Sequence, residues 1–146
     1  MNGLFVGEYS HNIDSKGRII IPAKFREQLG DNFMITIGFE GCLYVYPMQA
    51  WEEFVENLSK LPSNQAQARK LQRIFASGAS EAEPDKQGKV LLTQPHRDHA
   101  KLTKEVTIIG SISHVEIWDS TRWKEYRDAE NMSLEEAAEN LDSIVF

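Results

Sequence analysis

The chain has few cysteines and no long apolar runs, and each shortage excludes a class of protein. Its 146 residues include one cysteine, Cys42, which excludes an intramolecular disulfide framework and a metal site built from cysteines alone. We expect Cys42 to be a small, partly buried residue. The apolar runs are only a few residues long, far short of the roughly 20 residues that span a bilayer. Residues 1–7 lack the cationic start and apolar stretch of a secretory signal, so we expect a cytoplasmic protein with no membrane partner.

Basic residues are missing from the end of the chain. Six acidic residues and no lysine or arginine follow Arg127, and these six acids account for the whole net charge of −6. Residues 14–26, in contrast, contain four cations and one acid. The acidic composition therefore does not exclude a basic face that binds nucleic acid.

The sequence contains an internal repeat. Residues 14–21, DSKGRIII, align with residues 85–92, DKQGKVLL, at a spacing of 71 residues. After one extra residue in the second copy, LYVY at 43–46 aligns with VEIW at 115–118, and WEEF at 51–54 aligns with WKEY at 123–126. Conserved order and spacing over this length indicate a duplicated structural unit.

Each copy is expected to form a small unit of strands and helices. Asp14 can accept hydrogen bonds from nearby backbone amides and Gly17 can adopt a positive φ, so we expect a tight turn there. Pro22 suits the first turn of a helix and Gly30 its end. The residue patterns predict strands over 7–13, 19–21, 33–37 and 43–46, a turn over 38–41, and helices over 23–29, 49–61 and 64–77. Ser133 and Glu136 predict a capping box for a last acidic helix.

Neither copy is large enough to bury a sheet alone. Each has about 45 residues and short apolar strands, so we expect the two copies to share one core with interleaved hairpins that leave few exposed edges. Trp51 and Trp123 occupy equivalent positions and are interpreted as equivalent anchors in the core or in an interface. The helix over 64–77 is interpreted as an amphipathic connection with a solvated cationic face.

The motif GEYSHNIDSKGRIIIPAKFREQLG and the duplication resemble the MraZ family of bacterial transcriptional regulators, from about Phe5 to Leu141. The resemblance implies a mixed β/α fold with a mainly β core. Specifically, it implies a tandem AbrB-like swapped-hairpin (double-split) β-barrel with peripheral helices. The domains expected on this basis are a first repeat at 5–61, a connecting helix at 62–78, a second repeat at 79–127 and an acidic tail at 128–146.

The resemblance also implies a function. MraZ proteins form rings and bind short direct repeats of double-stranded DNA upstream of their own division and cell-wall operon, which implies a nucleoid-associated protein. The family's turn supplies the DNA contact, and this carries over to Asp14, Lys16, Gly17 and Arg18. Two features depart from the family pattern: Lys89 stands where the motif prefers arginine, and TQPHRDHA replaces PAKFREQL.

The residue chemistry supports the same site. Arg18 can offer a planar fork to a guanine edge or a phosphate, whereas lysine acts as a flexible point charge. We therefore expect Lys86 and Lys89, in the turn shaped by Asp85 and Gly88, to contribute less specificity. Lys24 and Arg26 are predicted to add salt-sensitive phosphate contacts, although each could be an ordinary cation on a helix surface.

Other functions are less well supported by the sequence. The Asp-x-x-Gly motif also occurs in nucleotide hydrolases, but the chain has no phosphate-binding Gly-x-x-x-x-Gly-Lys-Ser/Thr loop, and Ser15 has no recognisable base partner. His96 and His99 lie three residues apart without a third ligand nearby, so we predict no metal site. We expect no enzymatic activity, cofactor or small-molecule substrate. The main alternative is an antitoxin-like or assembly protein whose basic turns bind an acidic protein.

Overall fold

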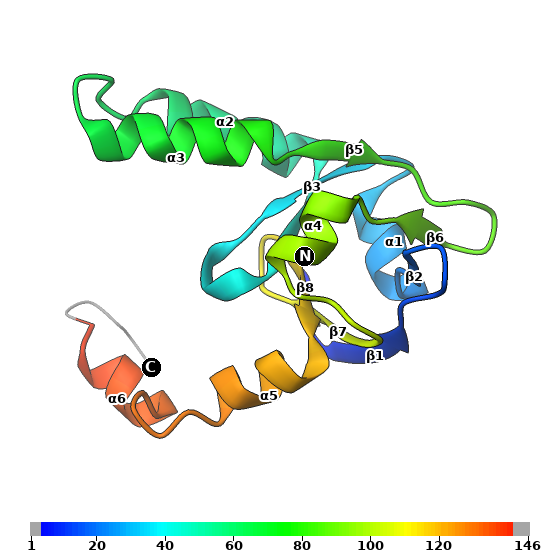
Figure 1. Cartoon of the computed structure of the whole chain (residues 1–146). Coiled ribbons are helices and arrows are strands. Elements are labelled where there is room, and N and C mark those ends of the chain that lie inside the picture. Colours follow the sequence, from blue (N-terminus) through cyan, green and yellow to red (C-terminus); the bar gives the residue numbers. More distant parts are fainter. Residues whose placement is uncertain (1–3, 142–146) are drawn as a thin grey trace.

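The computed structural model describes residues 4–141 and shows a mixed fold of antiparallel strands and helices (Figure 1). The first half contains β1 (Glu8–Asn12), β2 (Arg18–Ile20), α1 (Ala23–Leu29), β3 (Phe33–Ile37), the 3-10 turn η1 (Phe39–Gly41), β4 (Leu43–Pro47), α2 (Met48–Ser59) and α3 (Ala66–Ser77). The second half contains β5 (Ser80–Ala82), β6 (Lys89–Leu91), α4 (Gln94–His99), β7 (Glu105–Gly110), β8 (Val115–Asp119), α5 (Ser120–Arg127) and α6 (Leu134–Glu139).

The strands of the two halves pair with each other. Six strands form one sheet in the order β1-β7-β8-β4-β3-β5, and β2 and β6 form a separate two-stranded ribbon. The strand that precedes each turn crosses to the other half, since β1 pairs with β7 and β5 pairs with β3. The ribbon also joins the two halves, with Ile19 opposite Val90.

The predicted elements form for the expected local reasons. Strands over 33–37 and 43–46 are confirmed as β3 and β4, and the helix over 23–29 is confirmed as α1. The amide of Gly30, at a φ of 89°, donates to the Arg26 carbonyl and ends α1. Other boundaries differ from the prediction by one or two residues. Pro22 is the N-cap of α1 rather than a residue of its first turn. The helix α2 ends two residues before the predicted end at 61, and α3 begins two residues after the predicted start at 64.

The C-terminal helix begins as its sequence predicts. The Ser133 hydroxyl accepts a hydrogen bond from the Glu136 amide at 3.1 Å and caps α6. This bond satisfies one of the free amides of the first helical turn. The expected tail at 128–146 extends beyond the described residues, which end at Leu141.

One hydrophobic core receives side chains from both halves. The ribbon contributes Ile19 and Val90, and the sheet contributes Ile35 and Ile117, all of them at most 1% exposed. Other fully buried side chains of this core lie on α1, on β4 and β7 and directly after β6, among them Phe25, Leu43, Val45, Ile108 and Leu92. Removing apolar area of this extent from water is the main force that stabilises such a domain.

Cys42 is more deeply buried than its sequence context predicts. It packs with Ile109 and Trp118 in a second, smaller cluster, and its thiol donates to the Phe39 carbonyl at 3.3 Å. Burial raises the pKa of this thiol, so Cys42 is held as an unreactive core residue.

The β core and its peripheral helices agree with the expected fold class. Within residues 4–141 the strands make two antiparallel sheets and do not close into one hydrogen-bonded barrel, so the swapped-hairpin barrel stays a prediction. No helix in this part of the chain is long and apolar enough to cross a membrane.

Candidate nucleic-acid interface

The first turn, between β1 and β2, is held by one carboxylate. Asp14 Oδ1 accepts hydrogen bonds from the amides of Lys16 and Arg18, both at 2.9 Å. The Gly17 amide donates to the Asp14 carbonyl at 3.0 Å, and Gly17 has a φ of 82°. This left-handed conformation favours glycine, and the network confirms the predicted turn chemistry.

The second turn, between β5 and β6, repeats this network. Asp85 Oδ1 accepts from the amides of Gln87 and Lys89, again both at 2.9 Å. Gly88 donates to the Asp85 carbonyl at 2.9 Å and also has a φ of 82°. The duplication therefore preserves the backbone geometry of the turn as well as its sequence.

The two turns differ in the cation that follows the glycine. Arg18 Nε donates to Asp14 Oδ2 at 2.8 Å, which holds the guanidinium beside the carboxylate of its own turn. Lys89 occupies the equivalent position: its amide hydrogen bond is the largest cause that lowers the pKa of Asp85, and its side-chain charge adds a smaller contribution. The Arg18 fork is oriented by this bond, whereas a lysine ammonium has no comparable planar constraint.

The β2–β6 ribbon brings both turns to one edge of the molecule (Figure 1). Each glycine carbonyl accepts from the other strand: Gly17 from the Leu92 amide and Gly88 from the Ile21 amide, both at 3.0 Å. Because the strands are antiparallel, one turn enters the ribbon at each end. Asp85 also lies close enough to Arg18 for that charge to contribute to its lowered pKa.

An arginine from the opposite half packs against each turn. The Arg97 guanidinium, from α4, lies against Gly17, and a Cβ at Gly17 would overlap it. The Arg26 guanidinium, from α1, lies against Gly88 in the same way. Each turn is therefore supported by a helix that belongs to the other repeat.

The two supporting arginines are bonded differently. Arg97 Nη1 donates to the Leu92 carbonyl at 2.6 Å and Nη2 donates to Gln94 Oε1 at 2.7 Å. Arg26 Nε is buried without a hydrogen-bond partner within the described part of the chain. Arg26 is thus half-buried beneath the second turn rather than extended from the helix surface, and its phosphate contact stays a prediction.

The other predicted contact residues have different surroundings. Lys16 and Lys86, at the tips of the two turns, are exposed, as is Lys24 on α1. Lys89 is half-buried. Their roles in DNA binding stay predictions.

The histidines considered as metal ligands contact carbonyl groups of other elements. His96 is buried, with Nε2 at 2.6 Å from the Gly78 carbonyl, and His99 Nε2 lies 3.1 Å from the Gly38 carbonyl. Between residues 4 and 141 no group of three or more histidine, cysteine or acidic side chains is placed to hold a metal ion. Both histidines therefore connect α4 to the segments that contain Gly78 and Gly38.

Sequence reasoning missed the role of Arg97. The sequence does indicate that Arg97 is equivalent to Arg26, since the two arginines lie 71 residues apart, the same spacing as Asp14 and Asp85. The position of Arg97 in a segment that departs from the first copy concealed this equivalence.

The chain matches known proteins over nearly its full length. The family model described as "MraZ protein, putative antitoxin-like" matches twice, at residues 4–74 and 75–144. A protein named "Transcriptional regulator MraZ" from Lactobacillus gasseri is 47% identical, over 97% of this chain and 99% of its own length. Proteins of the same name from Desulforamulus reducens and Limosilactobacillus fermentum are each 49% identical, over 94% and 98% of this chain and 97% and 100% of their own lengths. The chain therefore belongs to the MraZ family.

Proposed function

We propose that this protein is a DNA-binding transcriptional regulator whose two turns contact DNA. The observation that carries the proposal is the pair of equivalent Asp-x-x-Gly turns, each followed by a cation, at the two ends of the β2–β6 ribbon. Relatives that share nearly half of its residues bear the name of a transcriptional regulator, which is not the name of an enzyme.

The two turns have different roles in this proposal. Arg18 reads a base edge, because its guanidinium is a planar donor fork. Lys16, Lys24, Lys86 and Lys89 contribute phosphate contacts, together with Arg26. Asp14, Gly17, Asp85 and Gly88 shape the turns. Lys89 adds less specificity than Arg18, since a point charge distinguishes bases poorly.

Useful affinity requires several copies in this proposal. One chain presents few groups that can read bases, so direct repeats in the DNA upstream of its own division and cell-wall operon are bound by many turns at once in a ring. We also propose that the chain forms the swapped-hairpin barrel of the family, with repeats at 5–61 and 79–127, a connecting helix at 62–78 and an acidic tail at 128–146. Under this proposal the protein works in the cytoplasm, at the nucleoid.

Fluorescence anisotropy would test the proposal. A labelled fragment from upstream of the protein's own gene is titrated beside scrambled DNA at two salt concentrations. We expect selective binding that weakens steeply with salt, because released counterions drive phosphate contacts. Arg18→Ala should abolish selectivity and leave the assembly intact, whereas Lys89→Ala should cost less.

The outcome also distinguishes the main alternative. Equal or absent binding to both fragments at low salt would exclude DNA recognition and favour an antitoxin-like or assembly protein that binds an acidic partner. Wild-type affinity and selectivity in Arg18→Ala would show that another residue reads the bases.

A further inference from the structure

The two repeats end in equivalent aromatic groups that are covered differently. In the first repeat Phe54 of α2 packs on Tyr46 and on Phe75 of α3, each at a ring-centroid distance of 5.2 Å. In the second repeat the equivalent residue, Tyr126 of α5, packs on Trp118 at 5.1 Å. Within residues 4–141 the helix that follows α5 is α6, which has no aromatic residue to pack on Tyr126 as Phe75 packs on Phe54, and Tyr126 is 46% exposed. The helix that covers the first aromatic group thus has no counterpart over the second.

The segment after α5 is both apolar and acidic. Leu134 is 83% exposed, and Met132 and Leu141 are also exposed. Five acids and no cations occur between Asp128 and Leu141. Neither α5 nor α6 has a buried residue, so an isolated chain leaves these apolar side chains in water, at a cost that grows with the exposed area.

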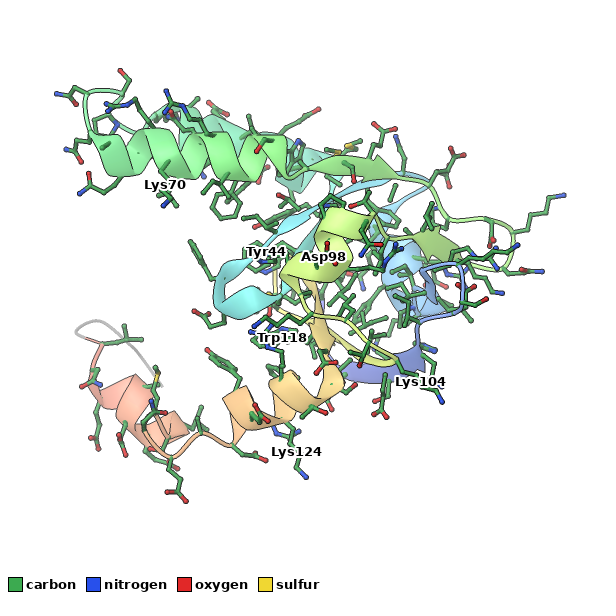
Figure 2. The ribbon with its side chains drawn as sticks, in the orientation of Figure 1. Tyr44, Lys70, Asp98, Lys104, Trp118 and Lys124 are labelled. Atoms are coloured by element: carbon green, nitrogen blue, oxygen red, sulfur yellow. The ribbon has the colours of Figure 1, made fainter. Side chains whose placement is uncertain are left out.

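The outer face of α3 has the complementary character. Leu71 and Ile74 are 37% and 40% exposed, and with Phe39 of η1 they line an apolar groove of about 520 Å³. The helix carries three cations and no acid. One of these, Lys70, also lines the groove, and Figure 2 shows its side chain on the lower side of α3.

From this complementarity we infer that the acidic segment 128–141 of one copy docks in the groove between α3 and η1 of a second copy. Its apolar side chains fill the groove while its carboxylates face the cations of α3. Opposite charges across such an interface select the partner and its orientation. In one chain, α6 and α3 lie at different sides of the molecule (Figure 1), which favours a second copy over the same chain.

This contact uses two different surfaces on each copy. It is therefore heterologous, and it generates a ring if the rotation between copies closes or a filament if it does not. The inference specifies the surfaces for the assembly that the proposed function requires, but it does not depend on DNA recognition. The elements that carry these surfaces, α3, η1 and α6, lie away from the β2–β6 ribbon (Figure 1), so the docking that we propose leaves the turns accessible.

Light scattering during size-exclusion chromatography, without DNA, would test the inference. Leu71→Asp places a carboxylate in the groove, and Leu134→Asp removes an apolar anchor from the acidic segment. We expect the wild type to form multimers and each variant to lose every species larger than one chain. Because both leucines are exposed in the single chain, each variant should keep the circular dichroism spectrum of the folded protein. Leu91→Asp, at a leucine that is 62% exposed on the ribbon, is the matched control and should keep the wild-type mass.

Mixing the two variants tests whether the surfaces meet. Leu71→Asp keeps its acidic segment and Leu134→Asp keeps its groove, so an equal mixture should give two-chain species and nothing larger. A single-chain wild type, a wild-type mass in either variant, dissociation of Leu91→Asp, or a mixture that stays monomeric would each overturn the inference. Failure of DNA recognition would leave these masses unchanged, so the two proposals fail separately.

Discussion

At the scale of single residues, the first turn depends on the ionised form of Asp14. The amide of Arg18 is the largest cause that lowers the pKa of Asp14 below its usual 3.8, helped by the Arg18 side chain and the Lys16 amide. Asp85 has a lowered pKa for the same reason, with the Lys89 amide as its largest cause. A carboxylate that accepts such bonds is favoured over its protonated form, which cannot accept as many.

The lowered pKa predicts how the turn responds to acid. Because the folded pKa of Asp14 lies below the unfolded one, its stabilising contribution is present above the unfolded pKa and is lost as pH falls through the folded pKa. The difference in unfolding free energy between wild type and Asp14→Asn should therefore shrink as the pH is lowered from about 7 to about 2.

Urea denaturation across this range measures the effect, and proton resonances of the Lys16 and Arg18 amides would follow the same titration. Asp31→Asn, outside both turns, is the control. A difference that does not change with pH, or an Asp14 midpoint at or above 3.8, would contradict the prediction.

At the scale of elements, each turn is completed by a helix from the other repeat. Gly17 combines a positive φ with close contact to the Arg97 guanidinium. A Cβ at position 17 therefore has two costs, the left-handed backbone conformation and the displacement of Arg97.

Gly17→Ala should thus destabilise the protein, and removal of the Arg97 side chain should reduce that loss. A non-glycine residue in this region costs about 1–3 kcal/mol, and displacement of Arg97 adds to it. In an Arg97→Ala background Gly17→Ala should cost less than in the wild type, with a coupling of about 0.5–3 kcal/mol between positions 17 and 97. Urea denaturation of the double-mutant cycle measures this coupling, and a coupling near zero would show that Arg97 does not support the turn.

At the scale of the whole molecule, the fold requires both halves at once. β1 pairs with β7, β5 with β3, and β2 with β6. Each half supplies outer strands whose hydrogen-bonding partners lie in the other half, and the core between them is common.

Chains cut at residue 78 should therefore not fold as monomers. We expect residues 1–77 and 78–146, expressed separately, to lack the wild-type circular dichroism spectrum in the monomeric state, and their mixture to recover it. Sedimentation velocity beside the spectra identifies the species. A folded monomeric half would contradict the shared core.

Much of the local structure could be predicted because its causes lie close together in the chain. Asp14 bonds amides two and four residues away, and the β-branched and apolar runs of β3 and β4 alternate with turn residues. The conformation of the two turns was predicted, but the contact of Arg97 with Gly17 was not, because it spans 80 residues and joins different repeats.

The amino-acid sequence by itself determined the duplication, the conformation of the two turns and the order of most elements, because short-range hydrogen bonds and residue periodicity are encoded locally. Only the tertiary structure decided which strands pair across the repeats, that Arg26 and Arg97 support opposite turns, and which aromatic group is left uncovered. These features depend on contacts between distant segments, which form when the two halves remove their apolar faces from water together.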